Sequence, residues 1–401
     1  DLIRILLGLA LLVAGAHGLV RGAVGLSRRV GISSLLIGLT VVAFGTSTPE
    51  VAVSVESALR GQGGVALGNV IGSNVFNILV ILGLSAVVTP LVVRSQLVRF
   101  DVPLMVAASA APLLLGLDGG LGRHDGFILL AGLLLYLALL GLLARRQRAR
   151  ARNRMPHAFT SAQAEAPSEV EATAQDSDTP QDSTLLSVAF ALGGLLLLSF
   201  GADQLVKGAV AVAGQLGVNE LVVGLTIVAA GTSLPELATS VAASLRGERD
   251  LAVGNAVGSN VFNALGVLGA GAVVSGIIPV PSGMYALDFP VMMAVALICL
   301  PVFLTGSTIS RAEGSVFLIY YAAYILYLIL HATDHALYDE FGMLVLAVVV
   351  PLSLAVGGAL AVRGWLSRGE SPAPSASGTP TASAPTAGRE GAPKGTPPEG
   401  S

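Results

Sequence analysis

The stretch GLTVVAFGTSTPE at residues 38–50 returns later in the chain as GLTIVAAGTSLPE at residues 224–236. A second pair of blocks follows each copy at the same spacing, LGNVIGSNVFN at residues 67–77 and VGNAVGSNVFN at residues 253–263. A single offset of 186 residues aligns both pairs without a gap. The sequence therefore predicts two homologous halves that fold alike.

The composition is typical of a protein that lies in a lipid bilayer. Hydrophobic residues make up 53% of the chain and charged residues only 12%. The mean hydropathy of +0.79 is far above the values of soluble domains. A helix needs about 20 apolar residues to cross a bilayer. Long apolar runs without alternating polar residues exclude an outer-membrane barrel, and no basic patch with aromatic residues indicates a nucleic-acid partner. Eleven segments have the required length, near residues 2–26, 33–58, 64–88, 99–117, 125–144, 184–211, 219–244, 250–276, 285–305, 312–332 and 341–366.

The order of these segments predicts the domain organisation. Five spans precede a polar linker, so the second half enters the membrane from the opposite side. The predicted fold is an all-α polytopic membrane protein with two inverted-topology five-helix repeats plus one extra C-terminal transmembrane helix. Inverted repeats are typical of secondary transporters, whose binding site lies near the midplane. The predicted parts are the first repeat at 1–144, a disordered linker at 145–183, the second repeat at 184–332, the additional helix within 333–368 and a disordered tail at 369–401.

The distribution of arginine predicts the orientation. If the N-terminus lies outside, the basic cluster at 144–154, the pair Arg28 and Arg29, and the pair Arg246 and Arg249 all face the cytoplasm. The positive-inside rule is then satisfied. We therefore expect the linker and the C-terminal tail to be cytoplasmic.

Each repeat places one glutamate, Glu50 or Glu236, inside an apolar segment of membrane length. An ionisable side chain at this depth is costly unless it meets a cation or a partner, which makes it a candidate functional residue. The proline before each glutamate predicts a helix break at Gly45 and Gly231 that frees backbone carbonyls, including those of Ala43 and Ala229. Only oxygen donors flank the glutamates, which suits Ca²⁺ or Na⁺ rather than zinc or copper. The flanking hydroxyl residues are Thr46, Ser47, Thr232 and Ser233.

The second block of each half adds further hydroxyl and amide groups. Ser73 and Asn77 are four residues apart, so we expect both to face the Glu50 site. Small polar residues also pack helices together in membranes. For Asn69 and Asn255, this structural role is as well supported as ion binding.

Several other ionisable residues have simpler interpretations. Asp101 and Asp288 each precede an early helix proline and are expected to be helix caps. Glu56 lies four residues before Arg60 and is expected to pair with it. His17 with Arg21, and their aligned counterparts Asp203 with Lys207, are interpreted as anchors near helix ends.

These motifs resemble the alpha repeats of the calcium/cation antiporter superfamily, and the chain is similar to prokaryotic sodium/calcium exchangers over residues 5–332. The resemblance implies a non-enzymatic antiporter of the prokaryotic inner membrane that exchanges Na⁺ for Ca²⁺ by alternating access. An H⁺/Ca²⁺ antiporter is the alternative, and a cation channel is less well supported. No partner beyond the ions and the bilayer is expected, no cofactor is expected, and the oligomeric state is left open.

The resemblance also implies which residues bind the ions. It assigns Ca²⁺ to Glu50, Glu236, Thr46 and Thr232. It assigns Na⁺ to those groups together with Ala43, Ser47, Ser73, Ala229, Ser233 and Ser259, with Asn77 and Asn263 near the centre.

Overall fold

The structure is a computed structural model of an all-α membrane protein. It describes residues 1–161, 183–218, 220–223, 226–227, 229–304 and 308–333, with single positions at 335, 337 and 342. The helix predicted at 341–366, the tail at 369–401 and most of the predicted linker lie outside the described residues. Among the described residues, eight helices are long and apolar enough to cross a membrane, and a bent helix pair makes a ninth span.

The first half contains five spans, and the second of them is the bent pair. The first is α1 (Leu2–Val30), and the bent span joins α2 (Ser34–Ile37), the π-helix η1 (Gly38–Val42), α3 (Ala43–Thr46) and α4 (Thr48–Leu59). The third span joins α5 (Gly63–Phe76), the π-helix η2 (Asn77–Leu82) and α6 (Gly83–Val88). The rest of this half is β1 (Leu91–Val92), the π-helix η3 (Leu97–Asp101), α7 (Val102–Leu115), the short 3₁₀-helix η4 (Gly116–Asp118), β2 (Gly120–Gly122) and α8 (Arg123–Ser161).

The second half repeats this order of elements. It starts with α9 (Thr184–Gln215), α10 (Glu220–Val223), α11 (Ala229–Gly231) and α12 (Leu234–Leu245). The next span joins α13 (Arg249–Val261), the π-helix η6 (Phe262–Val267) and α14 (Leu268–Ser275). The half ends with β3 (Ile277–Pro279), α15 (Ser282–Ala286), α16 (Asp288–Leu304), β4 (Thr308–Ile309) and α17 (Arg311–Ala332).

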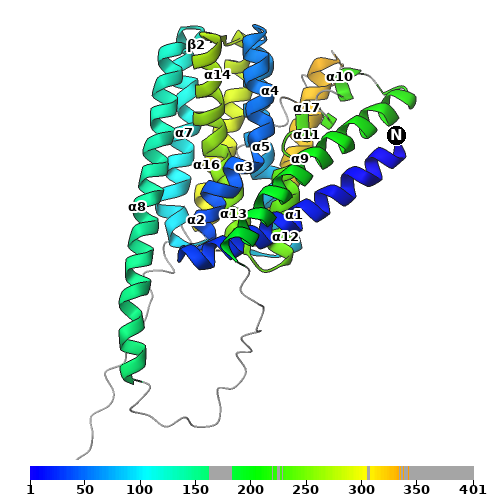
Figure 1. The fold of residues 1–401 in the computed structure, drawn as a ribbon. Coiled ribbons are helices and arrows are strands. Elements are labelled where there is room, and N and C mark those ends of the chain that lie inside the picture. The colour runs from blue at the N-terminus through cyan, green and yellow to red at the C-terminus, as the bar shows by residue number, and fades with distance from the viewer. Residues whose placement is uncertain are drawn as a thin grey trace, which may run out of the picture.

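Helices α1 and α9 lie side by side and run obliquely to the upright helices α4, α7, α8 and α14 (Figure 1). Glycine allows this close approach. A Cβ atom added at Gly8, Gly15 or Gly22 of α1 would lie only 2.5–2.8 Å from backbone atoms of α9. Such small-residue contacts join helices in lipid, where apolar side chains gain little by leaving the bilayer.

Two short antiparallel strand pairs tie the halves together. Strand β1 pairs with β4 through Leu91 and Ile309, and β2 pairs with β3 through Leu121 and Ile278. Because β1 and β2 lie at opposite ends of the fourth span, the two pairs lie at opposite ends of the molecule. In each half, one strand follows the third span (β1 or β3) and one strand precedes the fifth span (β2 or β4). Exchanging the two halves therefore turns the β1–β4 pair into the β3–β2 pair. This is expected of two halves with opposite orientation, whereas their placement across a membrane stays a prediction.

Two local predictions differ from the structure. Asp101 is not a helix cap, since it is the last residue of η3 and makes no capping hydrogen bond to α7. Helix η3 continues directly into α7, so the first N–H groups of α7 already have helical partners and need no cap. The linker was predicted to begin at residue 145, but α8 continues to Ser161. The arginines and alanines at 144–154 are strong helix formers, which favours this extension.

Candidate cation site

The bent second span places Glu50 in the core of the molecule. The span bends by 46° between Ser34–Thr46 and Thr48–Leu59, and Ser47 is the residue at the break. The break was predicted two residues earlier, at Gly45. It falls at Ser47 because Pro49 is compatible with the first turn of a new helix, so α4 begins just before it. The carbonyl of Ala43 still accepts the Ser47 N–H at 3.1 Å, so the predicted release of this carbonyl is wrong.

The second half contains the corresponding break. Helix α11 ends at Gly231, as predicted, and α12 begins at Leu234 with Pro235 in its first turn. Glu236 therefore follows the break just as Glu50 does in the first half. The two breaks place both glutamates near the first turn of a helix, which is favourable for a negative charge.

Glu50 and Glu236 are fully buried, and each is held by a serine from the other half. Ser233 Oγ donates a hydrogen bond to Glu50 Oε1 at 3.0 Å, and Ser47 Oγ donates to Glu236 Oε1 at 3.0 Å. Ser73 Oγ adds a longer hydrogen bond of 3.4 Å to Glu50 Oε1. The second oxygen of each carboxylate, Oε2, makes no hydrogen bond with any described residue. Two buried carboxylates with unpartnered oxygens are stable only when they bind a cation or a proton.

An asparagine in each half connects the glutamate backbone to the other half. Thr232 Oγ1 donates to Asn69 Oδ1 at 3.2 Å, while Asn69 Nδ2 donates to the backbone carbonyl of Glu50 at 3.3 Å. Asn255 makes the same two contacts, with Thr46 Oγ1 and with the backbone of the second glutamate. From the sequence, ion binding and helix packing were equally well supported for these two asparagines. The structure gives them a positioning role, which their repetition at the fixed offset could have indicated.

Three asparagines of the third spans are hydrogen-bonded to one another between the two halves. Asn74 Nδ2 and Asn260 Nδ2 each donate to the backbone carbonyl of the other, at 3.4 and 3.2 Å. Asn77 was expected to face Glu50, but its Nδ2 donates to Asn260 Oδ1 at 2.9 Å. The Oδ1 atoms of Asn77 and Asn263 make no hydrogen bond with the described residues, so both remain available as neutral oxygen ligands.

The structure gathers most of the sequence-predicted ligands in this one core. Thr232 is half-buried, and Ala229 is the first residue of α11, although its side chain lies outside the description. Among the described residues, no three or more His, Cys, Asp or Glu side chains lie together so that they could hold a metal ion, so the site combines two carboxylates with neutral oxygens. Exposure is at most 1% for Ala43, Thr46, Ser47, Glu50, Ser73, Asn77, Ser233, Glu236, Ser259 and Asn263.

Comparison with known proteins identifies the family. The family described as sodium/calcium exchanger protein matches residues 2–142 and 186–330 of the chain, which are the two halves just described. The chain belongs to the sodium/calcium exchanger family. The resemblance inferred from the repeated motifs is thus confirmed.

Two prokaryotic relatives match the chain over nearly their whole length. A putative antiporter, CaxA of Alkalimonas amylolytica, is 37% identical over 80% of this chain and 96% of its own. The sodium/calcium exchanger MaX1 of Methanosarcina acetivorans is 32% identical over 81% of this chain and 97% of its own. Among solved structures, the sodium-calcium exchanger NCX_Mj superposes with a TM-score of 0.65 at 29% identity, covering 82% of this chain and 98% of that one. The match to NCX_Mj confirms the polytopic all-α fold.

Proposed function

We propose that this protein is a secondary active antiporter that exchanges Na⁺ for Ca²⁺ across the cytoplasmic membrane by alternating access, in the direction of Ca²⁺ extrusion. The proposal rests mainly on the crossed pair of buried glutamates, Glu50 and Glu236, each with one unpartnered oxygen. Together the ionised pair carries a charge of −2. One Ca²⁺ neutralises this charge, whereas Na⁺ does so only when more than one ion binds.

The shared ligands explain how binding becomes coupled exchange. The same two carboxylates would bind either Ca²⁺ or Na⁺, so the two kinds of ion exclude each other. The neutral oxygens of Asn77, Asn263 and Ser259, which make no hydrogen bond with described residues, support binding of more than one Na⁺. Coupling then requires that the ion-free site, with its uncompensated charge of −2, does not change its access from one side to the other, and a channel would lack this property.

The H⁺/Ca²⁺ antiporter remains the second candidate. The observation that favours it is that serine donors reach only Oε1 of Glu50 and of Glu236. Oε2 of each glutamate could accept a proton in place of a metal ion, because burial favours the neutral form of a carboxyl group.

Flux measurements in proteoliposomes distinguish these candidates. ⁴⁵Ca²⁺ uptake is measured with the purified protein under an outward Na⁺ gradient without a pH gradient, and then under a pH gradient in Na⁺-free buffer. We expect uptake with the Na⁺ gradient and background uptake with the pH gradient. Uptake driven only by the pH gradient would establish the second candidate, and uptake without any ion gradient would contradict antiport.

A further inference from the structure

Asp101 is a buried carboxyl group outside the cation site. It is the last residue of η3, and its side chain is 0% exposed. Gln96 Nε2 donates to its Oδ2 at 3.2 Å, whereas its Oδ1 makes no hydrogen bond with any described residue. An ionised carboxyl group is costly to bury without a cation, so Asp101 needs either a counter-ion or a proton.

No described cation forms an ion pair with Asp101. Tyr136 of α8 interacts with it electrostatically. Arg94, which precedes η3, forms an ion pair with Asp250 at the start of α13, and Arg99 within η3 is exposed. The ionisable residues at 118–125 lie at the other end of α7 and α8. Further ionisable side chains on the helices that pack against η3 and α7 are described without an ion pair or hydrogen bond to Asp101, namely Arg145, Arg146, Arg148, Arg249 and Cys299.

The second half places an aspartate at the corresponding position but surrounds it differently. Asp288 aligns with Asp101 when one extra residue is allowed in the second half. The hydroxyl group of Tyr324 is hydrogen-bonded to Asp288, and His331 interacts with it electrostatically. Asp288 is half-buried, so water also reaches it. A hydrogen-bond donor, a nearby cation and water all favour the ionised form of a carboxyl group.

Two differences between the halves remove this support from Asp101. Helices α8 and α17 align from their first residues at an offset of 188, which matches Tyr136 with Tyr324 and Leu143 with His331. The hydroxyl group of Tyr136 is buried and makes no hydrogen bond with any described residue, so it does not donate to the aspartate as Tyr324 does. The position of the histidine is apolar. The first half thus leaves its aspartate with a single neutral donor.

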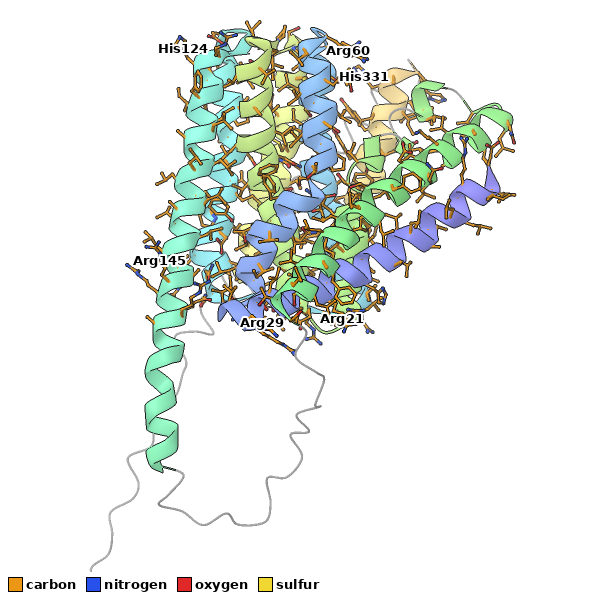
Figure 2. The ribbon with its side chains drawn as sticks, in the orientation of Figure 1. Arg21, Arg29, Arg60, His124, Arg145 and His331 are labelled. Atoms are coloured by element: carbon orange, nitrogen blue, oxygen red, sulfur yellow. The ribbon has the colours of Figure 1, made fainter. Side chains whose placement is uncertain are left out.

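The two aspartates lie at opposite ends of the molecule. His331 lies at the same end as His124, whereas Arg29 and Arg145 lie at the other end (Figure 2). Asp101 belongs to the end with the arginines, because α7 begins there and runs toward β2, which directly precedes α8 (Figure 1). The distribution of arginine predicts that this end faces the cytoplasm.

A methionine connects Asp101 to the asparagines between the two halves. Met105 lies one helical turn after Asp101, and its Sδ accepts a hydrogen bond from Asn260 Nδ2 at 3.7 Å. Asn260 Oδ1 in turn accepts from Asn77 Nδ2 at 2.9 Å. A change of charge at Asp101 would therefore act one turn away from a residue that contacts this group of asparagines.

We propose that Asp101 is a proton-binding site whose carboxyl group is protonated at neutral pH in this conformation, while Asp288 is ionised. Oδ1 carries the proton, because Oδ2 accepts the hydrogen bond from Gln96 and is therefore the carbonyl oxygen. A conformation that admits water to the start of α7 would favour release of the proton, so raising the pH at this end disfavours the present conformation. This consequence rests on the proposed alternating access, whereas the protonation itself does not.

Infrared difference spectroscopy of the purified full-length protein at neutral pH tests the protonation. A protonated carboxyl group has a C=O stretching band that is separate from the carboxylate bands and shifts in D₂O. The bands of the two core glutamates are common to all the proteins compared, so they cancel in the difference. The spectrum of the unchanged protein minus that of Asp101→Asn should show a protonated carboxyl band and no carboxylate band. In Gln96→Leu this band should shift to higher frequency, because the carbonyl Oδ2 loses its donor.

The aspartate of the other half provides a matched control. Asp288→Asn makes the same substitution at the aligned position and should remove carboxylate bands instead. The proposal is overturned if Asp101→Asn removes carboxylate bands, if the band stays in place in Gln96→Leu, or if Asp288→Asn also removes a protonated band. Thermal unfolding verifies that each variant is folded. If Asp101→Asn does not fold, the band shift in Gln96→Leu tests the protonation in its place.

The consequence for transport has its own measurement. Na⁺-driven ⁴⁵Ca²⁺ flux in proteoliposomes is recorded while the pH on both sides is raised above neutral. The flux of the unchanged protein and of Asp288→Asn should change with pH, and the flux of Asp101→Asn should change less. Equal pH profiles for all three proteins would overturn the link between this proton and alternation, even where the infrared spectra show the proton. Absence of Na⁺-driven flux at every pH would instead contradict the proposed exchange and this consequence with it.

Discussion

Replacing either buried glutamate by glutamine should abolish Ca²⁺ exchange while leaving the protein folded. Glutamine keeps the size of Glu50 or Glu236 and keeps a carbonyl oxygen that can accept the hydrogen bond from Ser233 or Ser47. The substitution removes only the charge. Because a buried charge without a partner is destabilising, Glu50→Gln in ion-free buffer should unfold at a temperature no lower than the unchanged protein.

The expected loss of affinity follows from the charge of the ion. Two unit charges about 4 Å apart interact by about 4 kcal/mol at an effective dielectric constant near 20, so one carboxylate attracts a divalent ion by about 8 kcal/mol. If desolvation offsets half of this attraction, losing the carboxylate still weakens Ca²⁺ binding by roughly a thousandfold. The variants should therefore show no measurable flux at Ca²⁺ concentrations that saturate the unchanged protein.

Two measurements test this prediction. ⁴⁵Ca²⁺ flux into proteoliposomes reports exchange, and the thermal midpoint with and without Ca²⁺ reports binding. Ca²⁺ at a hundred times its dissociation constant adds about 2.7 kcal/mol to the free energy of unfolding, and this increase should disappear in Glu50→Gln and Glu236→Gln. Glu56→Gln is the control, because Glu56 is exposed and pairs only with Arg60 among described residues, so its flux should be nearly unchanged. Normal flux, or a normal Ca²⁺ shift of the midpoint, in either core variant would refute the two-carboxylate site.

Three further predictions concern topology, ion choice and the asymmetry of the site. In a cysteine-free background, cysteine at Ser95 should react only with cytoplasmic reagents and cysteine at Ser282 only with external ones, whereas reaction from one side would refute the inverted orientation. Na⁺-driven Ca²⁺ flux should be unchanged when choline replaces K⁺, because neutral Asn263 adds no charge to hold an extra cation, and a strict K⁺ requirement would contradict this reasoning. Ser73→Ala should weaken equilibrium Ca²⁺ binding roughly tenfold and more than Ser259→Ala, because of these two serines only Ser73 donates a hydrogen bond to a described glutamate, and equal losses would refute this difference.

The fold could be predicted largely from the repeated sequence, because apolar length and an exact offset determine which segments span the membrane and which segments correspond. Finer features of the backbone could not be predicted from the sequence. The π-helices η2 and η6 begin at or beside the last asparagine of each motif, but a change of backbone hydrogen-bond register has no marker in residue spacing. The break at Ser47 depends on where α4 begins, and the proline fixes this only to within its first turn.

The residues that line the candidate site could be predicted one by one, and their role as ion ligands stays a prediction, but their hydrogen-bond partners could not be predicted. The offset shows that Ser47 is equivalent to Ser233 and that Glu50 is equivalent to Glu236. Equivalent positions in the two halves do not show which side chains are in contact. The simplest expectation is that each serine donates a hydrogen bond to the glutamate of its own motif. The structure shows the opposite arrangement, since each serine donates to the glutamate of the other half. Only the packing of the two bent spans against each other reveals this crossing.

The crossed hydrogen bonds are symmetric, but the asparagine centre and the third-span serines are not. Ser73 donates to Glu50 and Asn77 donates to Asn260, whereas Ser259 Oγ and both polar side-chain atoms of Asn263 make no hydrogen bond with described residues. The two halves have identical residues at these positions, so chemistry alone does not favour one side. An exchange of the two conformations would let Ser259 reach Glu236 and Asn263 reach Asn74, whose Oδ1 is also unpartnered. The exchange would keep the number of these hydrogen bonds, and the proposed alternating access requires two such related states.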